Sequence, residues 1–350
     1  MPAIASHLTP GVAADVLGLP SAQRYVLVLV DGLGWDNLYD ATSLAPTLRA
    51  MAASPLTVGM PSTTATSLTS LTTGVDAARH GMVGYSFRSR PGVILHTMAW
   101  DDPQANPEIV QPVPTWFQRL NNDVPSAVVV PSIFANSGMT RAFLRGADFI
   151  AVPKEDDWAT RVQQVADVMT THKLAYVYER SLDHVGHLKG WRSPMWAKKL
   201  ASVDSFVASL RTNLPAGTAL LVTGDHGMVD VPKTHRQFVE HEPDLAQGVD
   251  LVGGEARLRH LYTDDPVGVA RRWQRWLGSR AEVRVRADAM EWFGKDASRT
   301  VADRIGDVVA AILDDWAVLT LQRPGEANLI GMHGSLTPSE RRVPLLRELI

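Results

Sequence analysis

Short, unbroken apolar runs recur along the chain, and their pattern predicts strands that are buried on both faces. These runs occupy residues 26–30, 127–130, 148–152, 173–178 and 220–223. Strands with one exposed face would instead alternate apolar and polar residues. Segments with helical spacing lie among them, at 46–53, 160–169 and 196–210. Because strands alternate with helices, we predict an α/β fold around a mainly parallel sheet.

The pattern changes after about residue 250. Strands are predicted at 257–262 and 281–286 and helices at 266–278 and 287–293, while 307–313 and 317–321 read as the last core strands. We interpret the first four elements as a small inserted α+β lid. The predicted division is a catalytic core of residues 1–250 and 303–350 and a lid of residues 251–302. The proline-rich stretch 88–122 looks irregular, and we expect it to form a wall of the site.

Carboxylates and imidazoles follow several of the predicted strands. They are Asp31, Asp183, His187, Asp225, His226 and, in a glycine-flanked loop, His333. The carboxyl ends of parallel strands are where open α/β sheets place their sites. Asp183 and His187 are four residues apart, which puts both on one face of a helical turn, whereas His184 points elsewhere. Each residue alone could be a turn or capping group, but together they suit a divalent metal of the zinc type.

A hydroxyl-rich segment, PSTTATSLTSLTTG at 61–74, contains six threonines and three serines. We predict a turn and then a helix that starts near Thr64. A hydroxyl at that point faces the positive end of the helix and its free N–H groups, a favourable place for an anion. Simple capping is the alternative. Spacing alone leaves Thr63, Thr64 and Thr66 open as the reactive hydroxyl.

Composition limits which residues can bind a metal and which partners are expected. The chain has 350 residues and no cysteine, so any metal must be held by histidine and carboxylate. Its net charge of −3 gives no reason to expect bulk nucleic acid as a partner. The first residues lack a basic stretch followed by an apolar one, and no apolar run reaches about 18 residues, so we expect neither a signal peptide nor a membrane span. A cytoplasmic location is the expectation.

Several motifs occur in one order along residues 25–345. They are VLVDGLGWD around Asp31, MPSTTATSLTSLTTG around Thr64, LDHVGH at Asp183, TGDHGMVDVP at Asp225 and GMHGSLTPSE at His333. In this order they resemble the alkaline phosphatase superfamily, and most closely its type I phosphodiesterase/nucleotide pyrophosphatase branch. The resemblance implies a three-layer α/β/α sandwich with a mainly parallel central sheet.

The resemblance also implies roles for the residues in these motifs. Aligning Pro61 and Gly74 with the family pattern selects Thr64 as the nucleophile, which would form a covalent phospho-threonine. One metal would be held by Asp31, Asp225, His226 and Thr64, and a second by Asp183, His187 and His333. Zn²⁺ is expected at both positions, with Mn²⁺ or Mg²⁺ as alternatives. The backbone N–H of Ala65 and the hydroxyl of Ser67 would bind the substrate.

The implied activity is a metal-dependent hydrolysis of phosphoric esters, on a diester or a nucleotide pyrophosphate. The expected partner is thus a small phosphorylated molecule, with a nucleotide as one candidate. One departure matters: Ser67 stands where the branch usually has an Asn that donates to a phosphate oxygen. This favours a phosphomonoesterase as the alternative within the superfamily. A metal-binding pseudoenzyme is the alternative from another class.

Overall fold

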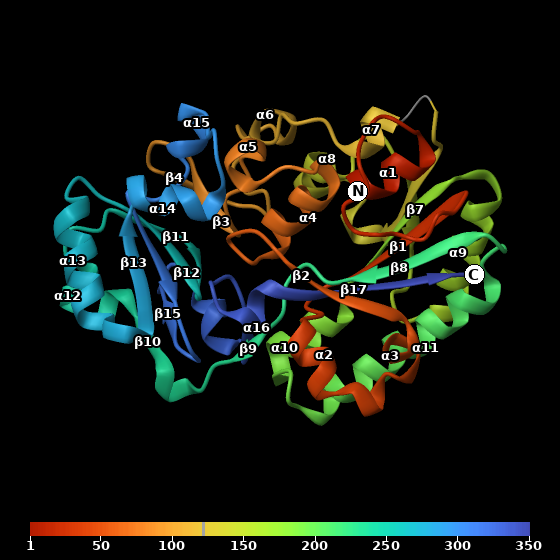
Figure 1. The fold of residues 1–350 in the computed structure, drawn as a ribbon. Helices are drawn as coiled ribbons and strands as arrows, with labels where there is room; N and C mark the ends of the chain where they lie inside the picture. The colour runs from red at the N-terminus through yellow and green to blue at the C-terminus, as the bar shows by residue number, and fades with distance from the viewer. Residues whose placement is uncertain (121–122) are drawn as a thin grey trace.

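The computed structural model describes residues 1–120 and 123–350, and a seven-stranded sheet runs through its larger part (Figure 1). In spatial order the strands are β2 (Ala52–Thr57), β17 (Arg342–Leu349), β8 (Thr218–Thr223), β1 (Arg24–Val30), β7 (Leu174–Glu179), β5 (Ser126–Pro131) and β6 (Asp148–Val152). All are parallel except β17, which is antiparallel to both of its neighbours. The mainly parallel sheet that the apolar runs predict is therefore confirmed.

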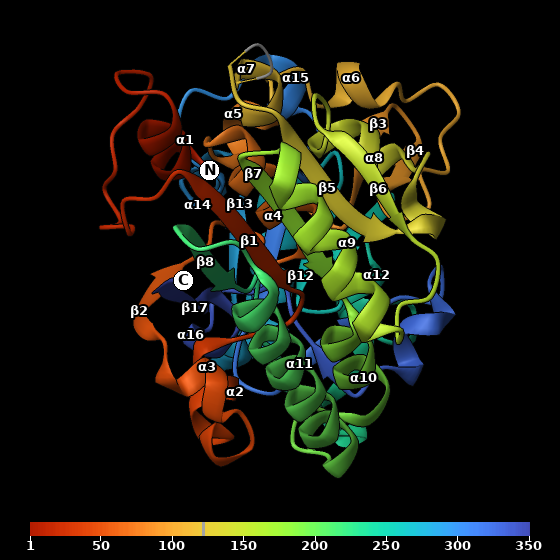
Figure 2. The same ribbon diagram turned by 90° about the vertical axis from the view of Figure 1, so that its right-hand side faces the viewer.

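Helices cover both faces of this sheet, because alternate residues of each buried strand enter different cores. On β1, Leu27 and Leu29 belong to one core and Val26 and Val28 to the other. The first core includes residues of α1 (Pro2–Leu8), α4 (Thr64–Thr73), α7 (Trp116–Leu120) and α8 (Gly138–Phe143). The second includes residues of α3 (Pro46–Ala50), α9 (Trp158–Thr171) and α11 (Pro194–Asn213). Figure 2 shows α9 and α11 lying across one face, so the expected three-layer sandwich is present.

A smaller, antiparallel sheet lies beside the central one. Its order is β11 (Leu251–Glu255), β12 (Leu258–Tyr262), β14 (Val308–Ile312) and β13 (Ala281–Val285). The helices α13 (Pro266–Leu277) and α14 (Arg286–Phe293) connect its strands on either side of β13. Trp273 on α13 packs against this sheet and is fully buried. The first strand of this sheet, β11, starts at Leu251, where the sequence predicts the lid to begin.

Two strands that we expected in the core belong elsewhere. The strand predicted at 307–313 is β14, which lies between β12 and β13 in the small sheet. The strand predicted at 317–321 is β15 (Ala317–Leu319), which pairs with β10 (Arg236–Phe238). Both are short, buried and apolar, and such composition does not tell which sheet a strand joins. The small sheet extends past residue 302, while the division into a core and a lid stays a prediction.

The stretch 88–122 is more regular than its prolines suggest. It contains most of a hairpin formed by β3 (Ser86–Arg90) and β4 (Val93–His96), followed by α6 (Pro107–Val110) and α7. Residues 121–122 lie outside the described part of the chain. The hairpin is held to the small sheet by a hydrogen bond from Ser86 Oγ to the carbonyl oxygen of Gly254, at 2.8 Å. None of the described helices is long and apolar enough to cross a membrane.

Candidate active site

The polar residues predicted at strand ends come together at the middle of the central sheet. Asp31 follows β1, and the two flanking strands, β7 and β8, carry the others. Asp225 and His226 follow β8, while Asp183 and His187 lie on α10 (Ser181–Lys189), directly after β7. Because these three strands are adjacent and parallel, their carboxyl ends meet at one edge of the sheet. The register of the sheet therefore explains why residues nearly 200 positions apart become neighbours.

Asp31, Asp225 and His226 form a compact, buried group whose ligand atoms all lie within 4.8 Å of one another. His226 Nε2 is 3.3 Å from Asp31 Oδ1 and 3.5 Å from Asp225 Oδ2. The hydroxyl of Thr64 lies 3.2 Å from the same nitrogen. These are the four residues that the family resemblance assigns to one metal, and the chain folds so that they converge.

A second group with the same spacing contains Asp183, His226 and His333. His187 lies beside it, with its Nε2 3.3 Å from Asp183 Oδ2 and its ring centre 5.1 Å from that of His333. The ring of His226 stacks on that of His333 at 3.5 Å. His226 therefore borders both groups. The assignment of His187 with Asp183 and His333 to the second metal stays a prediction.

The three histidines are all oriented by backbone carbonyl groups. Nδ1 of His187 is 2.8 Å from the Gly331 oxygen, and Nδ1 of His226 is 2.9 Å from the oxygen of Gly227. Nδ1 of His333 is 3.0 Å from the oxygen of Ser62. A carbonyl can only accept, so each Nδ1 carries a proton and Nε2 is the nitrogen left to bind a metal. This is the arrangement that metal-binding histidines use.

The aspartates of the site lack partners for part of their carboxylates. Asp31 Oδ1, Asp183 Oδ1 and Asp225 Oδ2 are buried and accept no hydrogen bond from the described residues. Burial, followed by the nearby charge of Asp31, raises the pKa of Asp225 to about 8. The same two causes raise the pKa of Asp183 well above its usual range. Buried carboxylates need compensating positive charge, and bound divalent cations would supply it. The donor set thus fits metals.

Thr64 is the first residue of α4, and its side chain differs from those of the neighbouring threonines. Thr63 donates to Glu255 Oε2 at 3.1 Å, and Thr66 donates to the carbonyl oxygen of Met82 at 2.9 Å. Thr64 instead faces His226. Of the three hydroxyls that spacing leaves open, Thr64 is therefore the one directed at the candidate metal ligands.

The start of α4 offers backbone donors beside Thr64. The first hydrogen bond of the helix runs from the N–H of Ser67 to the carbonyl oxygen of Thr63, at 2.9 Å. The earlier N–H groups, including that of Ala65, therefore have no acceptor within the helix. The side chain of Ser67 lies elsewhere: its buried hydroxyl has no partner among the described residues and borders a separate cavity together with Asp225.

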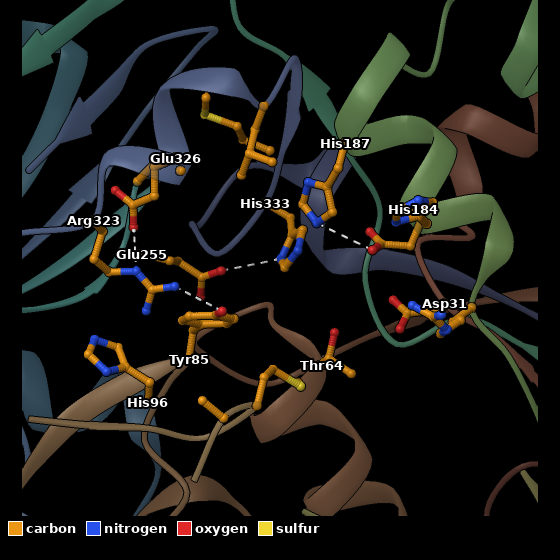
Figure 3. Close-up of a pocket in the computed structure, with 18 of the residues that line it drawn as sticks. Asp31, Thr64, Tyr85, His96, His184, His187, Glu255, Arg323, Glu326 and His333 are labelled. Carbon is orange, nitrogen blue, oxygen red and sulfur yellow. Dashed lines mark hydrogen bonds and ion pairs between the residues drawn. The ribbon is translucent and has the colours of Figure 1, made fainter. Parts of the chain in front are cut away.

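A pocket of about 680 Å³ opens over this site and extends away from it (Figure 3). At one end lie Asp31, Thr64, Asp183, His187 and His333, which we call the metal end. The other end, which we call the distal end, is lined by Tyr85, His96, Arg323 and Glu326. His96 ends the hairpin strand β4, and Glu326 lies in the 3₁₀ segment Pro324–Asn328. Glu255, the last residue of β11, is located between the two ends.

Two residues of the site were not identified from the sequence. Tyr178 donates a hydrogen bond to Asp31 Oδ2. It is the penultimate residue of β7. Tyr176 and Tyr178 are two residues apart on this strand and so point to the same face, which is only a weak signal that Tyr178 belongs to the site. Glu255 accepts from Thr63 and lies 3.5 Å from His333 Nδ1. Burial raises the pKa of Glu255 to about 8. No motif marks Glu255, and only the packing of the small sheet on the core brings it here.

Comparison with known proteins agrees with this geometry. The sequence model of the family described as type I phosphodiesterase/nucleotide pyrophosphatase matches residues 25–336. Human ectonucleotide pyrophosphatase/phosphodiesterase family member 7 is 27% identical over 266 residues, which are 68% of this chain and 55% of that protein. The chain therefore spans about half the length of this relative. Human GPI ethanolamine phosphate transferase 2, catalytic subunit, is 33% identical over only 84 residues, or 22% of this chain and 7% of that protein.

Solved structures share the fold. Human ectonucleotide pyrophosphatase/phosphodiesterase 5 superposes with a TM-score of 0.74 at 17% identity, covering 93% of this chain and 88% of the other. Phosphonoacetate hydrolase from Sinorhizobium meliloti, in complex with phosphonoformate, gives a TM-score of 0.71 at 20% identity and covers 94% and 91%. At such identities the likeness concerns the fold alone.

Proposed function

Because the chain belongs to the type I phosphodiesterase/nucleotide pyrophosphatase family of the alkaline phosphatase superfamily, we propose that it is a metal-dependent hydrolase of phosphoric esters. We further propose that the reaction passes through a covalent phospho-threonine at Thr64. The observation that carries this proposal is the position of Thr64 Oγ1, 3.2 Å from His226 Nε2 in a group that also contains Asp31 and Asp225. A threonine hydroxyl becomes a useful nucleophile only where its surroundings lower its pKa.

The chain supplies the remaining parts of the reaction. The Thr64 oxygen would form a bond to phosphorus as the ester oxygen leaves, and water would then cleave the phospho-threonine. Free N–H groups at the start of α4 are placed to donate to phosphate oxygens. Bound at the two groups of ligands, divalent metals would activate the hydroxyl and the water and stabilise charge on the phosphate. The mixture of imidazole and carboxylate favours Zn²⁺ over Mg²⁺.

We propose a diester or a nucleotide pyrophosphate as the substrate class, in line with the family. The AMP complex of an inactive variant of murine ectonucleotide pyrophosphatase/phosphodiesterase 5 shows that this relative binds a nucleotide. One observation favours a phosphomonoesterase instead. Ser67 replaces the usual Asn, and it lines a cavity other than the one that contains Thr64. A substrate held without that donor would depend more on the metals and the helix N–H groups.

Metal content and substrate preference test this proposal together. Elemental analysis of protein purified without chelators should find two zinc ions per chain. Rates on bis-p-nitrophenyl phosphate, p-nitrophenyl phosphate and p-nitrophenyl thymidine monophosphate should then rank the diesters first. A higher rate on the monoester would favour the phosphomonoesterase. Metal-free protein with full activity would contradict the proposed mechanism, and metal-loaded protein without turnover would favour the pseudoenzyme.

A further inference from the structure

The distal end of the pocket contains a guanidinium group that is only partly paired. Arg323 Nη2 donates to the hydroxyl of Tyr85 at 2.9 Å, and the guanidinium carbon lies 4.4 Å from the centre of the Tyr85 ring. Nη1 of the same group is buried and has no hydrogen-bond partner in the described chain. Arg180, the other arginine among the described lining residues, is different, since it makes two hydrogen bonds to Glu155, at 2.9 and 2.8 Å.

The carboxylate nearest to Arg323 is already shared with another arginine. Glu326 Oε1 lies 3.7 Å from Arg323 Nε. Both oxygens of Glu326 also accept from the guanidinium of Arg259, which is fully buried and cannot turn towards water. Glu326 thus lies near two guanidinium groups, so Arg323 has no carboxylate to itself.

The other carboxylates that line this pocket near Arg323 contact other residues. Asp101 pairs with His96, 2.5 Å from its Nδ1. Glu255 lies between the two ends, but its contacts are with Thr63 and His333. Figure 3 shows Arg323 and Tyr85 across the pocket from Asp31 and His187, with Thr64 between them and the metal ligands. A substrate whose phosphorus sits at Thr64 can therefore extend towards Arg323.

We propose that Arg323 binds an anionic group on the part of the substrate that does not react. The enzyme would then select phosphoric esters that carry a second anion, such as a carboxylate or another phosphate. A planar guanidinium that has no carboxylate to itself pairs well with either anion, whereas a neutral group would leave its charge without a partner. This inference rests on the proposed function, because it places the reacting phosphorus at Thr64.

Matched substrates can isolate this contact. We suggest p-nitrophenyl ω-carboxyalkyl phosphates with linkers of increasing length, each compared with its methyl ester. The pair shares the reacting phosphorus and the leaving group and differs only in the distant charge. For the wild type, kcat/KM should favour the acid at one linker length. In Arg323→Met this preference should fall about tenfold, as expected for the loss of a charged hydrogen bond. Arg323→Lys should retain part of it.

Controls separate selectivity from folding. Arg79→Met removes an exposed arginine that does not line the pocket, and it should keep the preference of the wild type. Unfolding midpoints of the three variants show whether Arg323→Met is folded, and Arg323→Lys provides a second test if it is not. Equal use of acid and ester by the wild type, or an unchanged preference in both Arg323 variants, would overturn the proposal.

A binding measurement keeps this inference separate from the proposed function. The non-hydrolysable ω-carboxyalkyl phosphonates and their methyl esters can be titrated into zinc-loaded wild type and Arg323→Met by calorimetry. If no ester is turned over, the proposed function fails, and the affinity ratio alone decides on Arg323. A preference for the acid that depends on Arg323 supports the inference, and equal affinities contradict it.

Discussion

The two ends of the pocket are built in different ways. The metal end consists of residues that directly follow adjacent parallel strands, so the register of one sheet places Asp31, Asp183 and Asp225 together. The distal end is assembled from the β3–β4 hairpin and the segment around Glu326, which pack on the small sheet. A rigid sheet suits groups that must hold one geometry, whereas loops and insertions can change without disturbing it. We infer that chemistry is set at one end and selectivity at the other.

The two ends also differ in charge. The metal end gathers buried carboxylate oxygens without protein partners, which calls for bound cations. The distal end holds an arginine whose nearest carboxylate is shared with Arg259, which calls for an anion. A phosphoric ester with a second negative group would fit both ends. Its reacting phosphate would face the metals, and its other anion would face Arg323.

The sharpest test of the metal end is the removal of the Thr64 hydroxyl. Thr64→Ala should lower kcat/KM on the order of 10³-fold or more, because the nucleophile and the metals act as a unit. Thr64→Ser should keep part of the activity, since the attacking oxygen remains. The hydroxyls of Thr63 and Thr66 have other partners, so their alanine variants should lose far less. The four variants need assays at equal metal content.

A near-normal rate for Thr64→Ala would break the comparison between the two ends, because the nucleophile would then lie elsewhere. If Thr63→Ala were inactive and Thr64→Ala active, the nucleophile would be Thr63. In either case the alignment of Pro61 and Gly74 with the family pattern would be wrong.

The metal end could be predicted from the sequence because its signals are local. An apolar run that stops at a carboxylate marks a strand end, as at Asp31. The spacing of Asp183 and His187 marks one face of a helix, which is α10. Their convergence depends only on the strands being neighbours in one sheet. The order β8-β1-β7 itself could not be read from these runs and is given by the structure.

The distal end could not be predicted, because no local pattern joins its parts. Arg323 and Tyr85 are separated by 238 residues and meet only through the packing of the small sheet and the hairpin. The strand β14 is as apolar and buried as β1, so its sequence did not reveal that it joins the small sheet. The strand β17 was missed because Pro344 and charged residues interrupt its apolar pattern.

A smaller effect should come from Tyr178, which supports the metal end without belonging to a motif. It donates to Asp31 Oδ2, and removing such a partner of a metal ligand costs about 10–100-fold in metal affinity. Tyr178→Phe should therefore weaken zinc binding by that factor in a chelator competition. Tyr176→Phe is the matched control, because the Tyr176 hydroxyl is buried without a hydrogen-bond partner in the described chain. Equal zinc affinity in both variants would show that Asp31 needs no orientation by Tyr178.

The smallest expected effect concerns His260, which ties the small sheet to the segment before the hairpin. On β12, its Nε2–H donates to the carbonyl oxygen of Val83 at 2.9 Å, and its Nδ1 accepts from the N–H of Gly306 at 3.1 Å. Both bonds require the neutral ring. Burial lowers the pKa of His260 to about 4. The unfolded chain, with a histidine pKa near 6.5, takes up this proton first as the pH falls.

The folded state should therefore lose stability as the pH drops from about 6.5 towards 4. Between pH 7 and 5.5, His260 alone should account for about 1 kcal/mol of the loss in the free energy of unfolding. His260→Gln can still donate and accept but cannot be protonated, so its stability should fall less steeply over this range in urea unfolding. His241→Gln, at an exposed histidine, should follow the wild type. Parallel curves for all three proteins would mean that the support of the distal end does not depend on a neutral His260.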